Sequence, residues 1–160
     1  MTRWTEADLR RLQRDCAAPN QAKTDEVPFL PGEAVVIELP MVPSSNHLFL
    51  TLAGNKGRAK TAEYRAWIKE AGTRLALQRP PCVKGRVRLL IEVSEHEVPA
   101  SADVANREKA ATDLLVSMGV IEGDSKRYVR EITLRWADIT GIRITIWPEE
   151  INENRGITIA

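Results

Sequence analysis

A group of polar side chains with a spacing suited to phosphate chemistry lies between residues 103 and 124. If this segment is helical, a rotation of about 100° per residue places four of them within an arc of roughly 120°. These four are Asp103, Asn106, Lys109 and Asp113, and a turn then supplies a further carboxylate, Asp124. Carboxylate oxygens are ligands that Mg²⁺ prefers, and a neighbouring ammonium group can offset charge on a phosphate. The pattern therefore predicts Mg²⁺-dependent hydrolysis of a phosphodiester.

These residues also have purely structural interpretations. Asp103 stands where a helix would begin, as an ordinary N-cap does, and Asp124 lies in a Gly-Asp-Ser turn, where aspartate is common. Lys109 and Asp113 could form an exposed i,i+4 ion pair that contributes roughly 0.3 kcal/mol. Taken one at a time, these residues therefore favour a structural role.

The same residues, with a second group upstream, resemble the sequence signatures of the RusA family of Holliday-junction resolvases. The upstream group is Pro43, Ser44 and Asn46, and the downstream group is Asp103, Asn106, Lys109, Asp113, Gly119 and Asp124. The resemblance covers about residues 35–148. It implies a nuclease that resolves four-way DNA junctions in recombination and repair. It also implies a homodimer, Mg²⁺ (or Mn²⁺) as cofactor, and a bacterial or phage setting.

The resemblance and the chemistry together suggest a role for each residue. Asp103 and Asp124 are expected to hold Mg²⁺, which lowers the pKa of an attacking water. Lys109 is expected to neutralise charge that builds up on the phosphate. Asn106 would hold an aspartate in place or contact a metal-bound water. Asp113 is the candidate to replace a family ligand that this chain lacks.

The chain departs from the family pattern in three places. Ala105 and Gly123 stand where the family has aspartates, and residues 97–102 contain no arginine where the family tends to have several. The smaller set of carboxylates leaves two other functions open. One is a protein of the same fold that binds junction DNA without cutting it. The other is a protein-interaction module that uses the acidic face and the N-terminal helix.

The predicted DNA-contact surface is the loop from Ser44 to Lys60. Seven Lys or Arg residues against two Glu fall within residues 55–79, although the whole chain carries a net charge of only +1. A basic stretch on a nearly neutral protein suits contact with phosphates. The residues expected to reach DNA are Asn46, His47, Lys56, Arg58 and Lys60.

Hydrophobic periodicity predicts the elements that must position these residues. A helix that begins at Thr61 carries an apolar stripe of Tyr64, Trp67, Ile68, Ala71 and Leu75. The last two strands, joined by a short link, are predicted to form an antiparallel hairpin. The order βαβαββ indicates an α+β domain with a mixed sheet. The predicted strands are Ala34–Leu39, Gly85–Ser94, Tyr128–Trp136 and Gly141–Trp147.

Three regions are predicted: an N-terminal extension and linker over 1–33, with a short helix from Thr5 to Asp15, a nuclease domain over 34–148, and a tail over 149–160. A composition of 43% hydrophobic and 28% charged residues is typical of a soluble globular protein. No apolar run approaches the roughly 20 residues of a membrane span, which predicts a cytoplasmic protein without a membrane partner. Cys16 and Cys82 are expected to be reduced and packed, without zinc.

Overall fold

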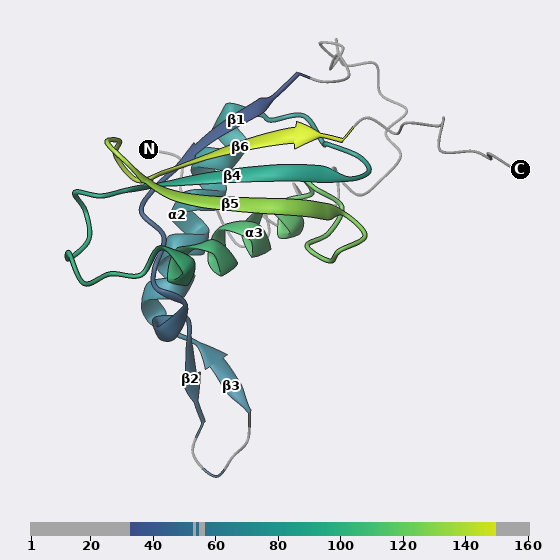
Figure 1. The fold of residues 1–160 in the computed structure, drawn as a ribbon. Helices are drawn as coiled ribbons and strands as arrows, with labels where there is room; N and C mark the ends of the chain where they lie inside the picture. The colour runs from purple at the N-terminus through teal and green to yellow at the C-terminus, as the bar shows by residue number, and fades with distance from the viewer. Residues whose placement is uncertain (1–32, 53, 55–56, 150–160) are drawn as a thin grey trace, which may run out of the picture.

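The computed structural model describes residues 33–52, 54 and 57–149, and Figure 1 shows their arrangement. The predicted helix at Thr5–Asp15, Lys56, and the tail beyond residue 149 lie outside these residues. Within them, no helix has both the length and the apolar composition that crossing a membrane requires. With η for a 3-10 helix, the elements are β1 (Val35–Leu39), η1 (Ser45–His47), β2 (Phe49–Thr51), β3 (Arg58–Lys60), α2 (Ala62–Gln78), β4 (Val87–Ser94), η3 (Val104–Arg107), α3 (Glu108–Ser117), β5 (Val129–Ala137) and β6 (Ile142–Pro148).

Four strands form one mixed sheet in the order β1-β6-β4-β5. β4 runs parallel to β5 and antiparallel to β6, and β6 runs antiparallel to β1. The two longer helices, α2 and α3, lie on the same face of this sheet (Figure 1). The predicted α+β class with a mixed sheet is therefore confirmed.

The last two strands do not pair with each other, so the predicted hairpin is wrong. β4 lies between β5 and β6 and is paired with both. Most residues of β4 are buried, which favours the middle of the sheet for this strand. The link from Ala137 to Gly141 instead passes across the end of β4. There the Ser94 amide donates to the Gly141 carbonyl oxygen (2.9 Å) and the Glu95 amide donates to that of Ala137 (3.1 Å).

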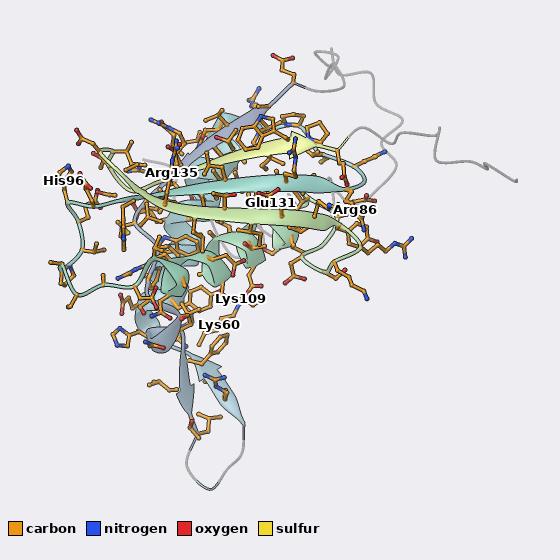
Figure 2. All side chains as sticks on the ribbon, in the orientation of Figure 1. Lys60, Arg86, His96, Lys109, Glu131 and Arg135 are labelled. Carbon is orange, nitrogen blue, oxygen red and sulfur yellow. The ribbon has the colours of Figure 1, made fainter. Side chains whose placement is uncertain are left out.

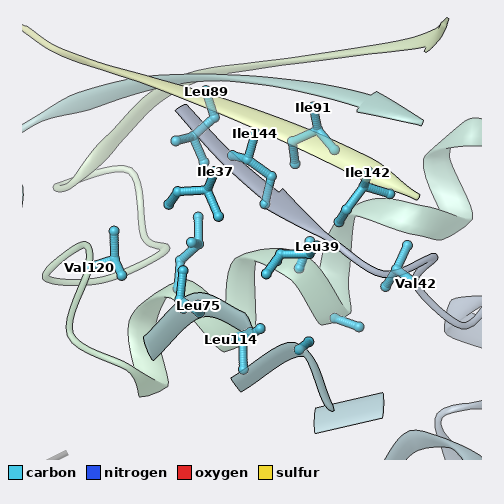
Figure 3. Close-up of a cluster of buried hydrophobic side chains, with 14 of the residues drawn as sticks. Ile37, Leu39, Val42, Leu75, Leu89, Ile91, Leu114, Val120, Ile142 and Ile144 are labelled. Carbon is cyan, nitrogen blue, oxygen red and sulfur yellow. The ribbon is translucent and has the colours of Figure 1, made fainter. Parts of the chain in front are cut away.

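The core forms where alternating side chains of the sheet meet the two helices (Figure 3). Leu89 of β4, Ile144 of β6 and Ile37 of β1 are each at most 1% exposed, and Leu75 of α2 packs against them from the helix layer. Most of the predicted apolar stripe of α2 is buried, and Ile68 is partly buried against the core. Cys82 is exposed, so its predicted packing is wrong, because it lies in the surface segment between α2 and β4.

The segment predicted as a loop contains a projecting β-hairpin, formed by β2 and β3, which we call the arm. Phe49 lies opposite Lys60 and Thr51 opposite Arg58. The arm extends away from the sheet and the helices (Figure 1). Glycines in this segment indicated a loop, but they lie at the turn of the hairpin, where Gly57 has a φ of 105°.

Thr61 fixes the base of the arm to the first turn of α2. Its hydroxyl donates to the His47 carbonyl oxygen (2.8 Å) and accepts from the Tyr64 amide (3.1 Å), as an N-cap residue does. The Thr61 amide also donates to the Leu48 carbonyl oxygen (3.0 Å). The start of the helix and the base of the arm are therefore held by the same residue.

The sheet face away from the helices carries a row of alternating charges, one from each strand, which we call the charge row. It consists of Glu38 of β1, Arg143 of β6, Glu92 of β4 and Arg135 of β5, neighbours in the strand register. Arg143 lies 3.1 Å from Glu38 and 3.9 Å from Glu92, and Arg135 donates two hydrogen bonds to Glu92 (2.6 and 3.1 Å). Glu92 is only 8% exposed, so the two arginines offset the cost of burying its carboxylate.

The outer edge of β1 is covered by one side chain of α2. The Gln78 side-chain oxygen accepts from the Glu38 amide (2.9 Å), and its Nε2 donates to the Glu38 carbonyl oxygen (2.7 Å). This side chain makes the two hydrogen bonds that a neighbouring strand would otherwise make with Glu38. The β1 edge is therefore closed to a further strand at this point.

Candidate functional site

Lys109 of α3 lies between two carboxylates. Its ammonium nitrogen is 2.7 Å from Asp113 Oδ1 and 3.0 Å from Asp124 Oδ2. Lys109 and Asp113 stand one turn apart on the helix. The chain then reverses at Gly119, whose φ of 71° lies in the left-handed region, and brings Asp124 back beside them. All three side chains are partly exposed, so water, a metal ion or a phosphate can reach them.

Mutual contacts set the charge state of this cluster. Hydrogen bonds to Asp113 and then to Asp124 raise the pKa of Lys109 well above its usual range. The hydrogen bond from Lys109 in turn lowers the pKa of the Asp124 carboxyl. At neutral pH the cluster therefore holds a charged lysine beside an ionised aspartate, which are the states needed to bind a phosphate and a cation.

Asp103 takes the N-cap position rather than a place in this cluster. The predicted helix is not continuous from residue 103, because η3 comes first and α3 begins only at Glu108. Asp103 precedes the first turn with an extended backbone, and its side chain caps that turn, so the prediction that it shares one face with residues 109 and 113 is wrong. Asp103 Oδ1 accepts from the Ala105 amide (2.9 Å). Among the described residues, no hydrogen bond or ion pair joins Asp103 to Lys109 or its two carboxylates.

The upstream and downstream segments that the sequence singled out lie in direct contact. The Ser45 hydroxyl donates to Asn106 Oδ1 (2.9 Å), and the Arg107 guanidinium donates to the Val42 carbonyl oxygen (2.8 Å). The Asn106 side chain thus contacts the η1 turn, and its backbone amide donates to the Asp103 carbonyl oxygen (3.2 Å); among the described residues, no hydrogen bond joins its side chain to an aspartate carboxylate. Asn46 and His47, in the same turn, are exposed.

A cavity of about 430 Å³ is shared by the Lys109 cluster and the base of the arm. Asp113 and Asp124 line it from α3 and the following turn, and Phe49, Lys60 and Tyr64 line it from the arm and α2. Lys60 lines this cavity and Lys109 is bound to the two aspartates that line it; both lysines are labelled in Figure 2. Burial, and secondly the charge of Asp113, raises the pKa of Tyr64, so its hydroxyl stays protonated and able to donate.

Two basic residues of the arm stand over the aromatic rings of this cavity. The Arg58 guanidinium carbon is 5.1 Å from the centre of the Phe49 ring, and Lys60 Nζ is 5.5 Å from the centre of the Tyr64 ring. Both cations are exposed. The cavity therefore combines acidic residues from α3 and its turn with basic residues from β3. Neither aromatic residue was predicted as a site residue: Phe49 reaches the cavity through the hairpin, and Tyr64 was assigned to the apolar stripe of α2.

The two positions where the family would have aspartates differ in the room they offer. A Cβ added at Gly123 would lie 2.6 Å from Cδ2 of Tyr128, so this ring occupies the space that an aspartate would need. Ala105 is exposed and meets no such obstacle at the surface. The carboxylate lacking at 123 is thus replaced by aromatic packing.

The carboxylates of Asp113 and Asp124 fit Mg²⁺, because their oxygens already converge on one cation, the ammonium of Lys109. Mg²⁺ commonly binds through one or two carboxylates and completes its octahedral shell with water and phosphate oxygens. Within the described ranges, no group of three or more Asp, Glu, His or Cys residues is arranged to hold a metal. Geometry therefore favours Asp113 with Asp124 as the ligand pair, whereas the sequence favoured Asp103 with Asp124.

Comparison with known proteins assigns no family: no protein-family model matches the chain, and no curated protein matches it. The chemistry of the site must therefore be inferred from its residues and their geometry.

Proposed function

We propose that this protein is a Mg²⁺-dependent endonuclease that cuts branched DNA, four-way junctions in particular, as a homodimer in the cytoplasm. The observation that carries the proposal is the meeting of Lys109 with Asp113 and Asp124 at the foot of a projecting basic arm. Carboxylates supply hard oxygen ligands for the ion, and a lysine beside them supplies positive charge for a phosphate.

The two aspartates, Lys109 beside them and Tyr64 each have a place in this chemistry. When bound, Mg²⁺ would polarise the scissile phosphate and lower the pKa of an attacking water. Asp113 and Asp124 would provide its protein ligands. Lys109 directs its ammonium group to a phosphate oxygen and offsets the charge that develops there. The protonated Tyr64 hydroxyl donates a hydrogen bond to a phosphate oxygen or a water in the same cavity.

The arm supports a preference for branched over linear DNA. Its apolar side chains Leu50 and Leu52 are 60% and 44% exposed, and the cations Arg58 and Lys60 are exposed on the paired strand. Apolar side chains can insert at unstacked base steps, while cations bind the surrounding phosphates. The centre of a four-way junction offers both kinds of contact.

A cleavage assay on a labelled four-way junction, run beside a linear duplex of the same sequence with Mg²⁺ or Mn²⁺, tests the proposal. Metal-dependent nicks placed symmetrically on the junction alone are the expected result. Tight junction binding without nicks would support a non-cleaving binding protein, the second candidate, which Ala105 and Gly123 favour because they reduce the number of carboxylates. Neither binding nor cutting would indicate a protein partner instead.

Replacing Arg58 and Lys60 together by alanine should weaken junction binding and make it less sensitive to salt. Each phosphate contact contributes about −0.9 to the slope of log K against log salt concentration, so the slope should flatten by roughly two. Fluorescence anisotropy over a salt series measures affinity and slope. The control, Lys84→Ala with Arg88→Ala, removes the same charge outside the arm. Equal effects of the two double variants would exclude the arm as the contact surface.

A further inference from the structure

β5 is a strand of 9 residues at the edge of the sheet, and its outer side is open. Glu131, Thr133 and Arg135 are exposed, and within the described residues no hydrogen bond is made to the outer backbone of residues 130–136. The β1 edge differs, because Gln78 occupies the backbone groups of Glu38 there. An open edge strand of this length is a template for pairing with another strand.

The charges of β5 are self-complementary in one register only. In a sheet made from two copies, residues that lie opposite each other must be on the same face. An antiparallel pair of β5 strands must therefore be centred on a residue that lies opposite its own copy, and not between two residues. Centred on Thr133, Glu131 lies opposite the partner's Arg135, and the partner's Glu131 lies opposite Arg135. Centred one residue earlier or later, Glu131 lies opposite the partner's Thr133 or the partner's Ala137. Directly opposite charges of unlike sign stabilise a strand pair, by roughly 0.2–1 kcal/mol each.

We infer that a second copy of this chain pairs with β5, antiparallel and centred on Thr133, so that the two four-stranded sheets become one. On the open face, Arg135 already contacts Glu92, and pairing adds the partner's Glu131 to the end of the charge row. Figure 2 shows Glu131 and Arg135 on this outermost strand. On the helix face, Ile132, which is 37% exposed, is covered by the partner's Leu134.

The two-fold axis of such a pair is perpendicular to the sheet, and this fixes where the two sites lie. Both helices and the arm project from one side of the sheet (Figure 1), so the helices, arms and Lys109 clusters of both copies lie on that same side. Two equivalent sites on one face suit a four-way junction, which is itself symmetric. The inference rests on the homodimer of the proposed function, but its tests use no DNA, so its failure and the failure of the cleavage assay are distinguishable.

A cysteine at position 133 tests the register. In a Cys16→Ser, Cys82→Ser background, Thr133→Cys should form a disulfide-linked dimer on mild oxidation, because opposite Cβ atoms lie about 4.5–5.5 Å apart. Glu131→Cys is the matched control, also exposed on β5. Its counterpart in the partner would lie about 13 Å away along the strand, too far for a disulfide. Cross-linking at 131 as strong as at 133, seen on a non-reducing gel, would overturn the register.

Sedimentation of the full chain gives an independent measurement of the pairing itself. The parent should form a dimer, and Glu131→Arg should raise its Kd by roughly tenfold or more, because two unlike pairs become like-charged. Glu95→Arg makes the same charge change at an exposed residue outside β5 and should leave the Kd unchanged. A parent that stays monomeric, or a Glu131→Arg variant with the parent's Kd, would overturn the inference.

Discussion

Asp124→Asn should reduce the rate of junction cleavage by on the order of 10²–10³-fold, because the asparagine amide cannot replace an ionised carboxylate as a ligand for Mg²⁺. Asn has the same shape, and Asp124 is exposed, so the fold should be retained. Junction affinity should also stay close to that of the parent, since phosphate contacts in the arm are untouched. Single-turnover cleavage rates and anisotropy measure the two effects. Unchanged cleavage would exclude Asp124 from the site.

Two further substitutions identify the second ligand. Asp113→Asn should lose as much activity as Asp124→Asn, because both carboxylates converge on the position that Lys109 now fills. Asp103→Asn is the matched control, since asparagine is also a good N-cap and should preserve η3. The control should retain most of its cleavage rate. If it loses activity while Asp113→Asn does not, the ion is bound by Asp103 and Asp124, the pair expected from the sequence.

Gly141→Ala should lower the free energy of unfolding by about 3 kcal/mol or more. Gly141 has a φ of 68°, and an added Cβ would collide with the carbonyl oxygen of Leu39 in β1. Leu39 is held opposite Ile142 in the β1–β6 pair, so its backbone cannot move aside without disturbing the sheet. Urea unfolding followed by circular dichroism measures the loss.

Gly85→Ala separates the two causes of that loss. Gly85 has a similar φ of 78°, but an added Cβ there would meet nothing within 4 Å. This control should therefore show only the cost of a left-handed backbone for alanine, roughly 1–2 kcal/mol. Equal losses in the two variants would mean that the contact with Leu39 contributes nothing.

Local signals were enough to predict most helices and strands, and nonlocal pairing explains what was missed. The stripe of α2 and the alternation of β4 follow from side-chain periodicity within one element. The order of strands depends on pairing between segments that are far apart in the sequence. The short link between β5 and β6 wrongly indicated that these two strands pair with each other. The charges at Arg130, Glu131 and Arg135 did contain a usable signal, since a strand with so many charges suits an edge.

The same distinction applies to the candidate site. Lys109 and Asp113 were predictable as helical neighbours, and Asp124 as the carboxylate that returns in the following turn. Asp103 was expected on the same face as Lys109, but its carboxylate is used as an N-cap, and an aspartate at a helix start fits either role by residue type alone. Phe49 reaches the cavity through the pairing of β2 with β3, which the glycines of the turn concealed, and Tyr64 reaches it from the stripe of α2 that was expected to face only the core.

The charge row has a consequence for how this sequence can evolve. Glu38 and Arg143 are 105 positions apart in the chain yet share hydrogen bonds, and Glu92 and Arg135 extend the same row. Because Glu92 is 8% exposed, loss of either arginine removes positive charge that offsets the cost of burying its carboxylate. Exchange of all four residues for uncharged ones leaves no buried carboxylate and carries no such cost. Among descendants of a common ancestor, these four positions should therefore co-vary, and substitutions there should be inherited as a set.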